Sequence, residues 1–137
     1  MAKNAFSRSL VLLGFAFFCT VALSPAQGQT IYSNIESSSG TVWSTSVTDL
    51  DYEDYYYGAF VYAELFDPYG NVLDSGSDQE DESFDAEVDL YGDASEPGYY
   101  SVEGSHWGFY LPADDWEFIG NSYDGTYVYP GGAGRRV

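Results

Sequence analysis

The clearest alternation of apolar and polar residues in this chain runs from residue 84 to residue 90. A period of two is typical of a β-strand with one buried face. Burying the large apolar side chains, at about 1.5–3 kcal/mol each, outweighs a repulsion of roughly 0.6 kcal/mol between neighbouring outward carboxylates. We therefore predict a strand whose register is set by burial. Its apolar positions are Phe84, Ala86, Val88 and Leu90, and its acidic positions are Asp85, Glu87 and Asp89.

Other segments follow the same pattern less strictly. Residues 55–66 are apolar at both odd and even positions, which predicts a central strand covered on both faces. Residues 67–71 carry turn residues and predict a hairpin that returns through 72–75. The polar, acidic stretch 76–83 is expected to be an exposed loop. Further strands are predicted at 30–36, 41–48, 99–104, 107–111 and 123–129.

No segment shows the apolar stripe of an amphipathic helix. Seven or eight short strands with frequent turn signals predict an all-β fold, an antiparallel sandwich or barrel. A single extended meander or an open sheet is the alternative. We expect a β-sandwich domain over residues 29–130, followed by a flexible tail over 131–137 that carries Arg135 and Arg136.

The first 28 residues have the organisation of a secretory signal peptide. Lys3 and Arg8 precede an apolar run over 10–23, and the small residues Ala26 and Gly28 follow at positions that a signal peptidase reads. The apolar run, about 14 residues long, is shorter than the ~20 needed to span a bilayer as a helix. We expect residues 1–28 to be removed on export, leaving a periplasmic or extracellular protein with no membrane insertion.

The chain that would remain is strongly acidic. It carries 22 Asp and Glu against Arg135 and Arg136, so its formal net charge is 2 − 22 = −20, and it has no lysine. This charge disfavours nucleic acid as a partner and favours cations and basic groups. Because Cys19 lies in the segment expected to be removed, no disulfide is expected. Stability must then come from burial, to which abundant aromatic side chains can contribute.

Residues 96–103 read Glu-Pro-Gly-Tyr-Tyr-Ser-Val-Glu. This segment resembles one that opens a late strand in bacterial immunoglobulin-like β-sandwich domains of secreted proteins, and the turn at 66–72 is similar to their mid-domain hairpin. The resemblance covers about forty residues and implies an antiparallel immunoglobulin-like sandwich of about seven strands. It also implies that Tyr100 bonds a backbone corner through its hydroxyl and that Val102 is a core residue. The chain lacks the two cysteines of antibody domains.

Catalytic motifs are absent from the sequence. The single histidine, His106, follows Ser105, but no nucleophile elbow is present, and we expect His106 to be a surface residue at a strand end. Acidic residues are too many to single out a glycosidase pair. We therefore expect no enzymatic activity and assign no catalytic or cofactor-binding residues.

Two acidic segments are candidates for Ca²⁺ binding, because hard oxygen ligands lie close together in each. Neither segment matches the EF-hand loop, so a solvated acidic loop is the simpler interpretation and the metal site stays open. The first segment contains Asp49, Asp51, Glu53 and Asp54, and the second contains Asp78, Glu80, Asp81 and Glu82.

The sequence agrees with two accounts of function. In the first, the protein is a structural or adhesive module at the cell envelope or outside the cell, and its acidic surface keeps it hydrated and unaggregated. In the second, it is a carbohydrate-binding module whose exposed rings stack on sugars and which bound Ca²⁺ would stabilise. The partner would be a protein or polysaccharide surface. The candidate rings are Trp43, Trp107, Trp116 and the run Tyr55-Tyr56-Tyr57, for which core or cross-strand packing is the alternative role.

Overall fold

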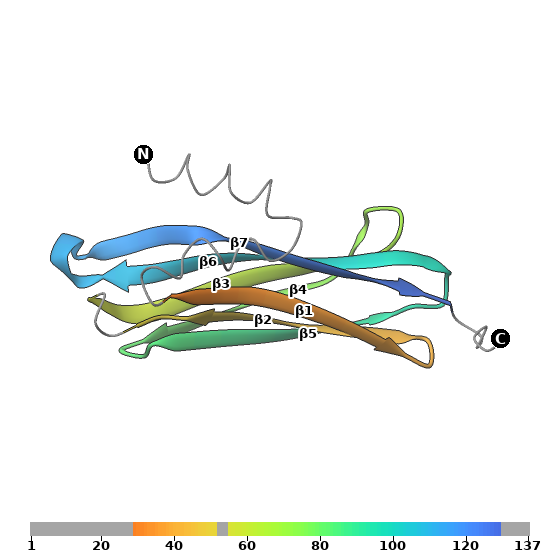
Figure 1. The fold of residues 1–137 in the computed structure, drawn as a ribbon, viewed down its shortest axis with the longest axis horizontal. Coiled ribbons are helices and arrows are strands. Elements are labelled where there is room, and N and C mark those ends of the chain that lie inside the picture. The colour runs from red at the N-terminus through yellow and green to blue at the C-terminus, as the bar shows by residue number, and fades with distance from the viewer. Residues whose placement is uncertain (1–28, 52–54, 130–137) are drawn as a thin grey trace.

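The structure, a computed structural model, describes residues 29–51 and 55–129. Two antiparallel sheets pack face to face, with strand order β1-β2-β5 in one and β4-β3-β6-β7 in the other (Figure 1). The predicted immunoglobulin-like β-sandwich is therefore confirmed. The expected signal peptide (1–28) and the tail (131–137) lie outside the described residues. The strands are β1 (Thr30–Ser38), β2 (Thr41–Asp49), β3 (Tyr56–Phe66), β4 (Val72–Asp81), β5 (Asp85–Asp93), β6 (Gly98–Tyr110) and β7 (Asp115–Val128).

The prediction that 76–83 is a loop was wrong for residues 76–81, because β4 continues to Asp81, and only residues 82 and 83 lie in a turn or loop. β4 is an edge strand, and its inward positions carry Asp74, Gly76 and Asp78 instead of apolar residues. These positions lie beside β5, the edge strand of the other sheet. Asp74 Oδ2 accepts a hydrogen bond of 3.0 Å from the backbone N–H of Tyr91, and Asp78 Oδ2 accepts one of 3.0 Å from that of Glu87. Inward carboxylates thus accept hydrogen bonds from two backbone donors at the edge of β5.

The opposite side of the sandwich uses the same device. Asp124 of β7 accepts a hydrogen bond of 3.0 Å from the backbone N–H of Ile35, in the other edge strand β1. Unpaired backbone groups at sheet edges promote pairing with other chains, and charged residues there oppose it. Several of the many carboxylates therefore have a structural role: they join the two sheets along both edges.

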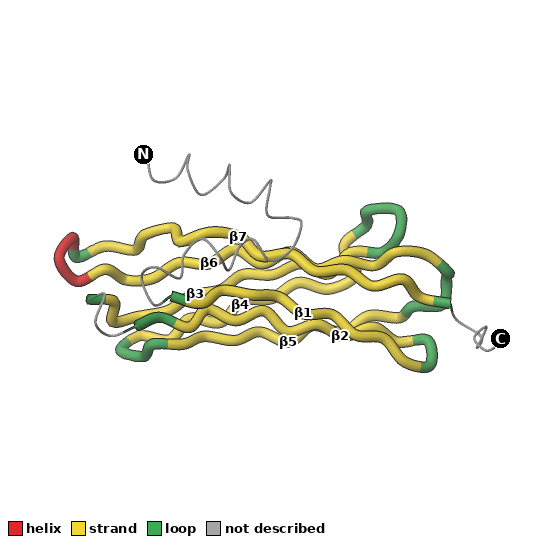
Figure 2. The backbone as a smooth tube through the Cα atoms, in the orientation of Figure 1, coloured by secondary structure: helices red, strands yellow, loops and turns green. Residues whose placement is uncertain are grey.

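Two further expectations about strands need correction. The strands expected at 99–104 and 107–111 are one continuous strand, β6, and β7 starts at Asp115 instead of residue 123. Between them lies the short 3₁₀ helix η3 (Leu111–Ala113), the helical turn marked in Figure 2. Ser105 and His106, which lie between the two predicted ranges, belong to β6.

Strand β3 is central in its sheet, as predicted, but it is covered on one face only. Ala59, Val61, Ala63 and Leu65 are fully buried between the sheets. The alternate positions, such as Phe60, are partly exposed, because no third layer lies over them among the described elements. The apolar character of both parities therefore indicates an unusually aromatic outward face.

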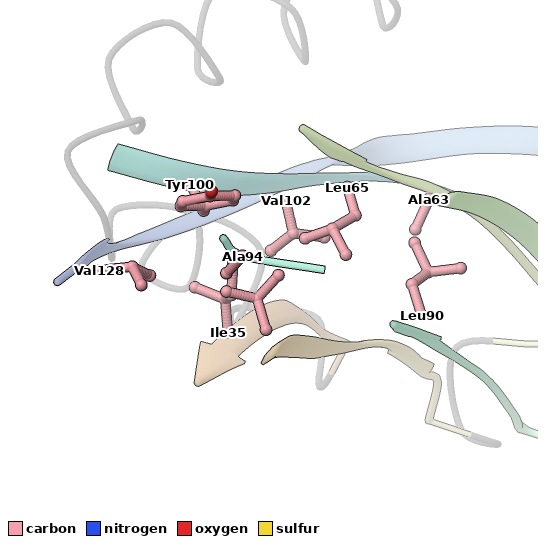
Figure 3. Packing of buried hydrophobic residues seen from close by; sticks show 9 residues of the cluster. Ile35, Ala63, Leu65, Leu90, Ala94, Tyr100, Val102 and Val128 are labelled. Atoms are coloured by element: carbon pink, nitrogen blue, oxygen red, sulfur yellow. The ribbon is translucent and has the colours of Figure 1, made fainter. Parts of the chain in front are cut away.

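The apolar interior forms two clusters along the length of the sandwich. Figure 3 shows the first, in which residues of both sheets meet between the layers. Tyr100 and Val102 of β6 belong to it, whereas the second cluster packs against Tyr110 at the other end of β6. The first cluster comprises Ile35, Val42, Ala63, Leu65, Leu90, Ala94, Tyr100, Val102 and Val128, and the second comprises Leu50, Tyr56, Ala59, Val61 and Ala86.

The features implied by the immunoglobulin-like resemblance are present. Tyr100 is 1% exposed, and its hydroxyl donates a 2.8 Å hydrogen bond to the carbonyl oxygen of Glu96. Val102 is fully buried. The predicted turn is also present, since Asp67 bonds to Asn71 through backbone and side-chain groups.

Between the two apolar clusters, the interior of β6 is polar, and here the sequence prediction failed. His106 is fully buried in the middle of the strand and is not a surface residue. Its Nδ1 lies 2.7 Å from Thr48 Oγ1, and its Nε2 lies 2.8 Å from Ser122 Oγ. Thr48 donates its own proton to the carbonyl oxygen of Phe60 at 3.1 Å. The histidine must therefore donate from Nδ1 and accept at Nε2.

The hydrogen-bonded chain continues on the far side of the ring. Ser122 Oγ lies 2.6 Å from Ser33 Oγ, which lies 2.7 Å from Ser46 Oγ. Because Nε2 accepts, Ser122 donates to the imidazole. Ser33 then donates to Ser122, and Ser46 donates to Ser33. Burial lowers the pKa of His106 from 6.5 to about 3, so the ring is neutral at physiological pH.

A candidate ligand-binding face on the four-stranded sheet

Five aromatic rings lie together on the outward face of β3, β6 and β7, and we call them the aromatic face. Each alternates along its strand with inward-facing residues, so its ring points away from the core. The β-sheet register places Phe60 opposite Trp107, Trp107 opposite Phe118, and Phe109 opposite Trp116. All five are half-buried.

The rings of the aromatic face hold one another in place. Ring centroids are 5.1 Å apart for Phe60 and Trp107, 5.3 Å for Trp107 and Phe118, and 5.5 Å for Phe109 and Trp116. Their planes are inclined by 59° to 72°, the tilted and edge-on geometry that aromatic pairs favour. The surface is therefore a fixed set of rings that a ligand can contact without ordering flexible side chains.

An open pocket of about 290 Å³ lies at the end of this face nearest η3. Gly58 helps to shape it, because a Cβ there would lie 2.9 Å from Phe109 Cβ and 3.2 Å from the Trp116 ring. The missing side chain lets both rings lie close to the backbone of β3. The pocket is lined by Tyr57, Gly58, Asp81, Glu82, Phe109 and Trp116.

Two of the residues lining this pocket are acidic. Glu82 follows β4 and has a left-handed backbone (φ 62°), which is uncommon for a residue with a side chain. Its backbone N–H donates a 3.1 Å hydrogen bond to the carbonyl oxygen of Tyr57, which fixes the end of β4 against the start of β3. Asp81 accepts a 3.1 Å hydrogen bond from Gln79. The pocket thus combines aromatic walls with two exposed carboxylates.

Further along the sheet the outward face becomes polar. Ser105 donates a 2.8 Å hydrogen bond to Asn121, and the hydroxyl of Tyr62 donates one of 2.7 Å to Glu64. Glu64 lies directly opposite Glu103. Burial, and then the like charge of Glu64, raise the pKa of Glu103. The face therefore presents rings at one end and hydroxyl, amide and carboxylate groups in its middle.

The structure brings together some candidate rings and separates others. Trp107, Trp116 and Tyr57 lie on or beside the aromatic face, whereas Tyr56 is buried. Trp43 lies on the outward side of the other sheet, where its indole N–H donates to Glu36 at 3.1 Å. Tyr55 is exposed just before β3. The alternative role predicted for these rings, cross-strand packing, is confirmed for Trp107 and Trp116, which pair with Phe118 and Phe109.

Sequence reasoning did not single out Phe60, Phe109 or Phe118. The signal was available, since Trp107 and Phe109 are two residues apart in β6, as are Trp116 and Phe118 in β7. A shared parity within a strand places both side chains on one face. The pairing of the strands, which brings the rings together, was not apparent from the sequence.

The two acidic segments do not form a metal cluster in the described part of the chain. Within residues 29–51 and 55–129 no three His, Cys, Asp or Glu are placed to hold a metal ion. Glu53 and Asp54 lie outside the described residues. Burial, and then the charges of Asp85 and Asp51, raise the pKa of Asp49. In the second segment, Asp78 bonds to the backbone of β5, and Asp81 and Glu82 line the pocket, so Ca²⁺ binding stays a prediction.

Comparison with known proteins identifies no family. No family model and no curated protein matches the chain. Similar solved structures include a glycosyl hydrolase family 2 member from Bacteroides cellulosilyticus (14% identity, 72% of this chain and 14% of that chain, TM-score 0.46). Others are the collagen-binding domain of a Staphylococcus aureus adhesin (4%, 72% and 97%, 0.45) and a penta-heme cytochrome c552 from Thermochromatium tepidum (9%, 73% and 40%, 0.48).

These similar structures differ widely in the activities that their names state. The present chain spans only 14% of the length of the glycosyl hydrolase that it matches. Across residues 29–51 and 55–129, no helix has the length and apolar character needed to cross a membrane. The activities named for these structures therefore do not transfer to this chain.

Proposed function

We propose that this protein is an exported, non-catalytic module that attaches to polysaccharide through the aromatic face. The observation that carries the proposal is the convergence of Trp107 and Trp116 with three phenylalanines and the acidic pocket on one outward surface. Fixed rings can stack on the apolar faces of sugars, and nearby hydroxyl, amide and carboxylate groups can bond sugar hydroxyls. Both the rings and the polar groups are present along the outward face of this sheet.

The proposed absence of catalysis is supported by the state of the single histidine. His106 is fully buried, and both ring nitrogens are bonded to hydroxyl groups in the interior. A general base must come within hydrogen-bond reach of the substrate, and this buried ring cannot do so. Glu64 and Glu103 face each other across β3 and β6 on the outward surface, where we assign them to contact with the ligand and not to catalysis.

An adhesive role at the cell envelope or outside the cell agrees with the remaining features. The signal-like segment predicts export, and the net charge of −20 after its removal keeps the module soluble. The carboxylates that bond across both sheet edges oppose pairing with neighbouring copies. Such a module would bind a polysaccharide surface without aggregating.

Replacing Trp116 by alanine tests this proposal. We expect at least a tenfold loss of affinity for a bound polysaccharide, equivalent to about 1.4 kcal/mol, because the variant removes one wall of the pocket and a partner of Phe60 and Phe109. Binding would be measured by affinity electrophoresis against a panel of soluble neutral and amino polysaccharides, with circular dichroism to verify folding.

The matched control is Trp43→Ala, which removes the same side chain from the opposite side of the sandwich. It should bind like the unmodified protein, and Trp116→Phe should recover part of the lost affinity. Equal affinities for the Trp116→Ala and Trp43→Ala variants, or no binding to any polysaccharide in the panel, would contradict the proposal.

A further inference from the structure

We infer that the pocket beside Trp116 binds the protonated amine of an amino sugar, so that the preferred ligand is a polysaccharide with free amino groups. This inference rests on the proposed function and specifies its ligand. The pocket, at about 290 Å³, is at the lower limit of ligand sites, which are typically about 300–1,000 Å³. It therefore suits one sugar-sized group and not a large aromatic cofactor.

The walls of the pocket favour a cation. Tyr57, Phe109 and Trp116 present aromatic side chains, and a cation within about 6 Å of a ring face is attracted by the electrons of the ring. The same rings can contact the apolar C–H groups of a sugar. An amino sugar offers both groups on one ring, whereas a neutral sugar offers only the second.

The charges of the pocket point the same way. Asp81 and Glu82 are exposed at its lining, and the sequence between residues 29 and 129 contains no lysine or arginine that could neutralise them. The one histidine there is buried elsewhere in the core. A bound ammonium group would supply the missing positive charge, whereas a uronic acid or sulfated sugar would be repelled.

The turn after β4 places Glu82 at the edge of the pocket. Glu82 has a left-handed backbone, a conformation that forms a turn here as it does at Ser39, Tyr55 and Asp114. Here that conformation occurs at a residue that lines the pocket, and its N–H is bonded to Tyr57 of the facing strand. The loop after β4 therefore keeps a carboxylate beside the aromatic walls.

The test compares trimers of glucosamine, N-acetylglucosamine and glucose, titrated against the full chain at about pH 5.5 with tryptophan fluorescence as the readout. The amine is protonated in the first trimer and acylated in the second. We expect the glucosamine trimer to bind at least tenfold more tightly than the other two. The double variant D81N/E82Q should remove this preference but keep the weaker binding of the acetylated trimer. The matched control E87Q/D93N removes two exposed carboxylates from β5 and should keep the preference.

The outcomes separate this inference from the proposed function. Equal binding of all three trimers, unchanged in D81N/E82Q, would overturn the inference and leave polysaccharide binding in place. Failure of every trimer and every polysaccharide to bind would overturn both. If only an oligolysine peptide bound, and bound more weakly to D81N/E82Q, the occupant would be a basic peptide and the amino-sugar inference would be wrong.

Discussion

Acidification from pH 7 to about pH 5 is expected to lower the free energy of unfolding by about 2 kcal/mol through His106 alone. Burial holds the pKa of His106 at about 3 in the folded protein, against 6.5 in the unfolded chain. Between these two values the unfolded chain binds a proton that the folded protein does not. The contribution of His106 to stability is therefore fully present above about pH 6.5. It falls by up to about 1.4 kcal/mol per pH unit as the pH falls toward 3.

This prediction can be tested directly because the chain contains one histidine. In ¹⁵N spectra, the ring should keep the neutral form with the proton on Nδ1 from about pH 8 to about pH 4.5, without titrating. Urea unfolding over the same range gives the stability. Asp49 and Glu103, whose pKa values are raised, act in the opposite direction as the pH falls, so the imidazole resonances are decisive. Titration of His106 near pH 6.5 in the folded protein would contradict its burial between hydroxyl groups.

Replacing Gly104 by alanine is expected to lower the free energy of unfolding by about 2–6 kcal/mol. A Cβ at this position would lie 2.9 Å from three atoms of the buried hydrogen-bonded chain: His106 Nε2, Ser122 Oγ and Ser33 Oγ. These atoms must move, which costs about 1–3 kcal/mol for overpacking and a further 1–3 kcal/mol where a buried polar group loses its partner. Urea denaturation would measure the loss.

Gly120→Ala is the matched control for this substitution. Gly120 lies opposite His106 in the neighbouring strand, but a Cβ there would meet only the terminal methyl carbon of Ile31, at 3.1 Å. That methyl group can shift, so we expect a change of less than about 1 kcal/mol. Equal stabilities for the two variants would show that the space beside His106 is not filled as described.

The sequence predicted strands well where one parity is apolar. β5 is such a case, since Ala86 and Leu90 are buried and the alternate carboxylates are exposed. β4 was missed because its inward row contains Asp74 and Asp78, whose partners are backbone groups of a strand in the other sheet. Only the packed structure shows that an inward carboxylate has such a partner.

The interior of β6 and the aromatic face were harder to predict for a related reason. A buried histidine between hydroxyl groups is indistinguishable in sequence from an exposed one, because its partners come from β2 and β7. The sequence likewise named Trp43, Trp107 and Trp116 without showing which of them lie together. That depends on strand pairing, which places Trp43 in the three-stranded sheet and the other two in the four-stranded sheet.

Because this strand pairing separates Trp43 from the other two tryptophans, the three indole N–H groups test the proposed binding surface most directly. The chain contains three tryptophans, so a ¹⁵N-labelled sample gives three indole N–H signals. On titration with an amino-sugar polysaccharide fragment, the signals of Trp107 and Trp116 should shift together, while that of Trp43 stays in place. A shift of the Trp43 signal alone, or no shift of the Trp107 and Trp116 signals at saturating ligand, would contradict the assignment of the aromatic face as the binding surface.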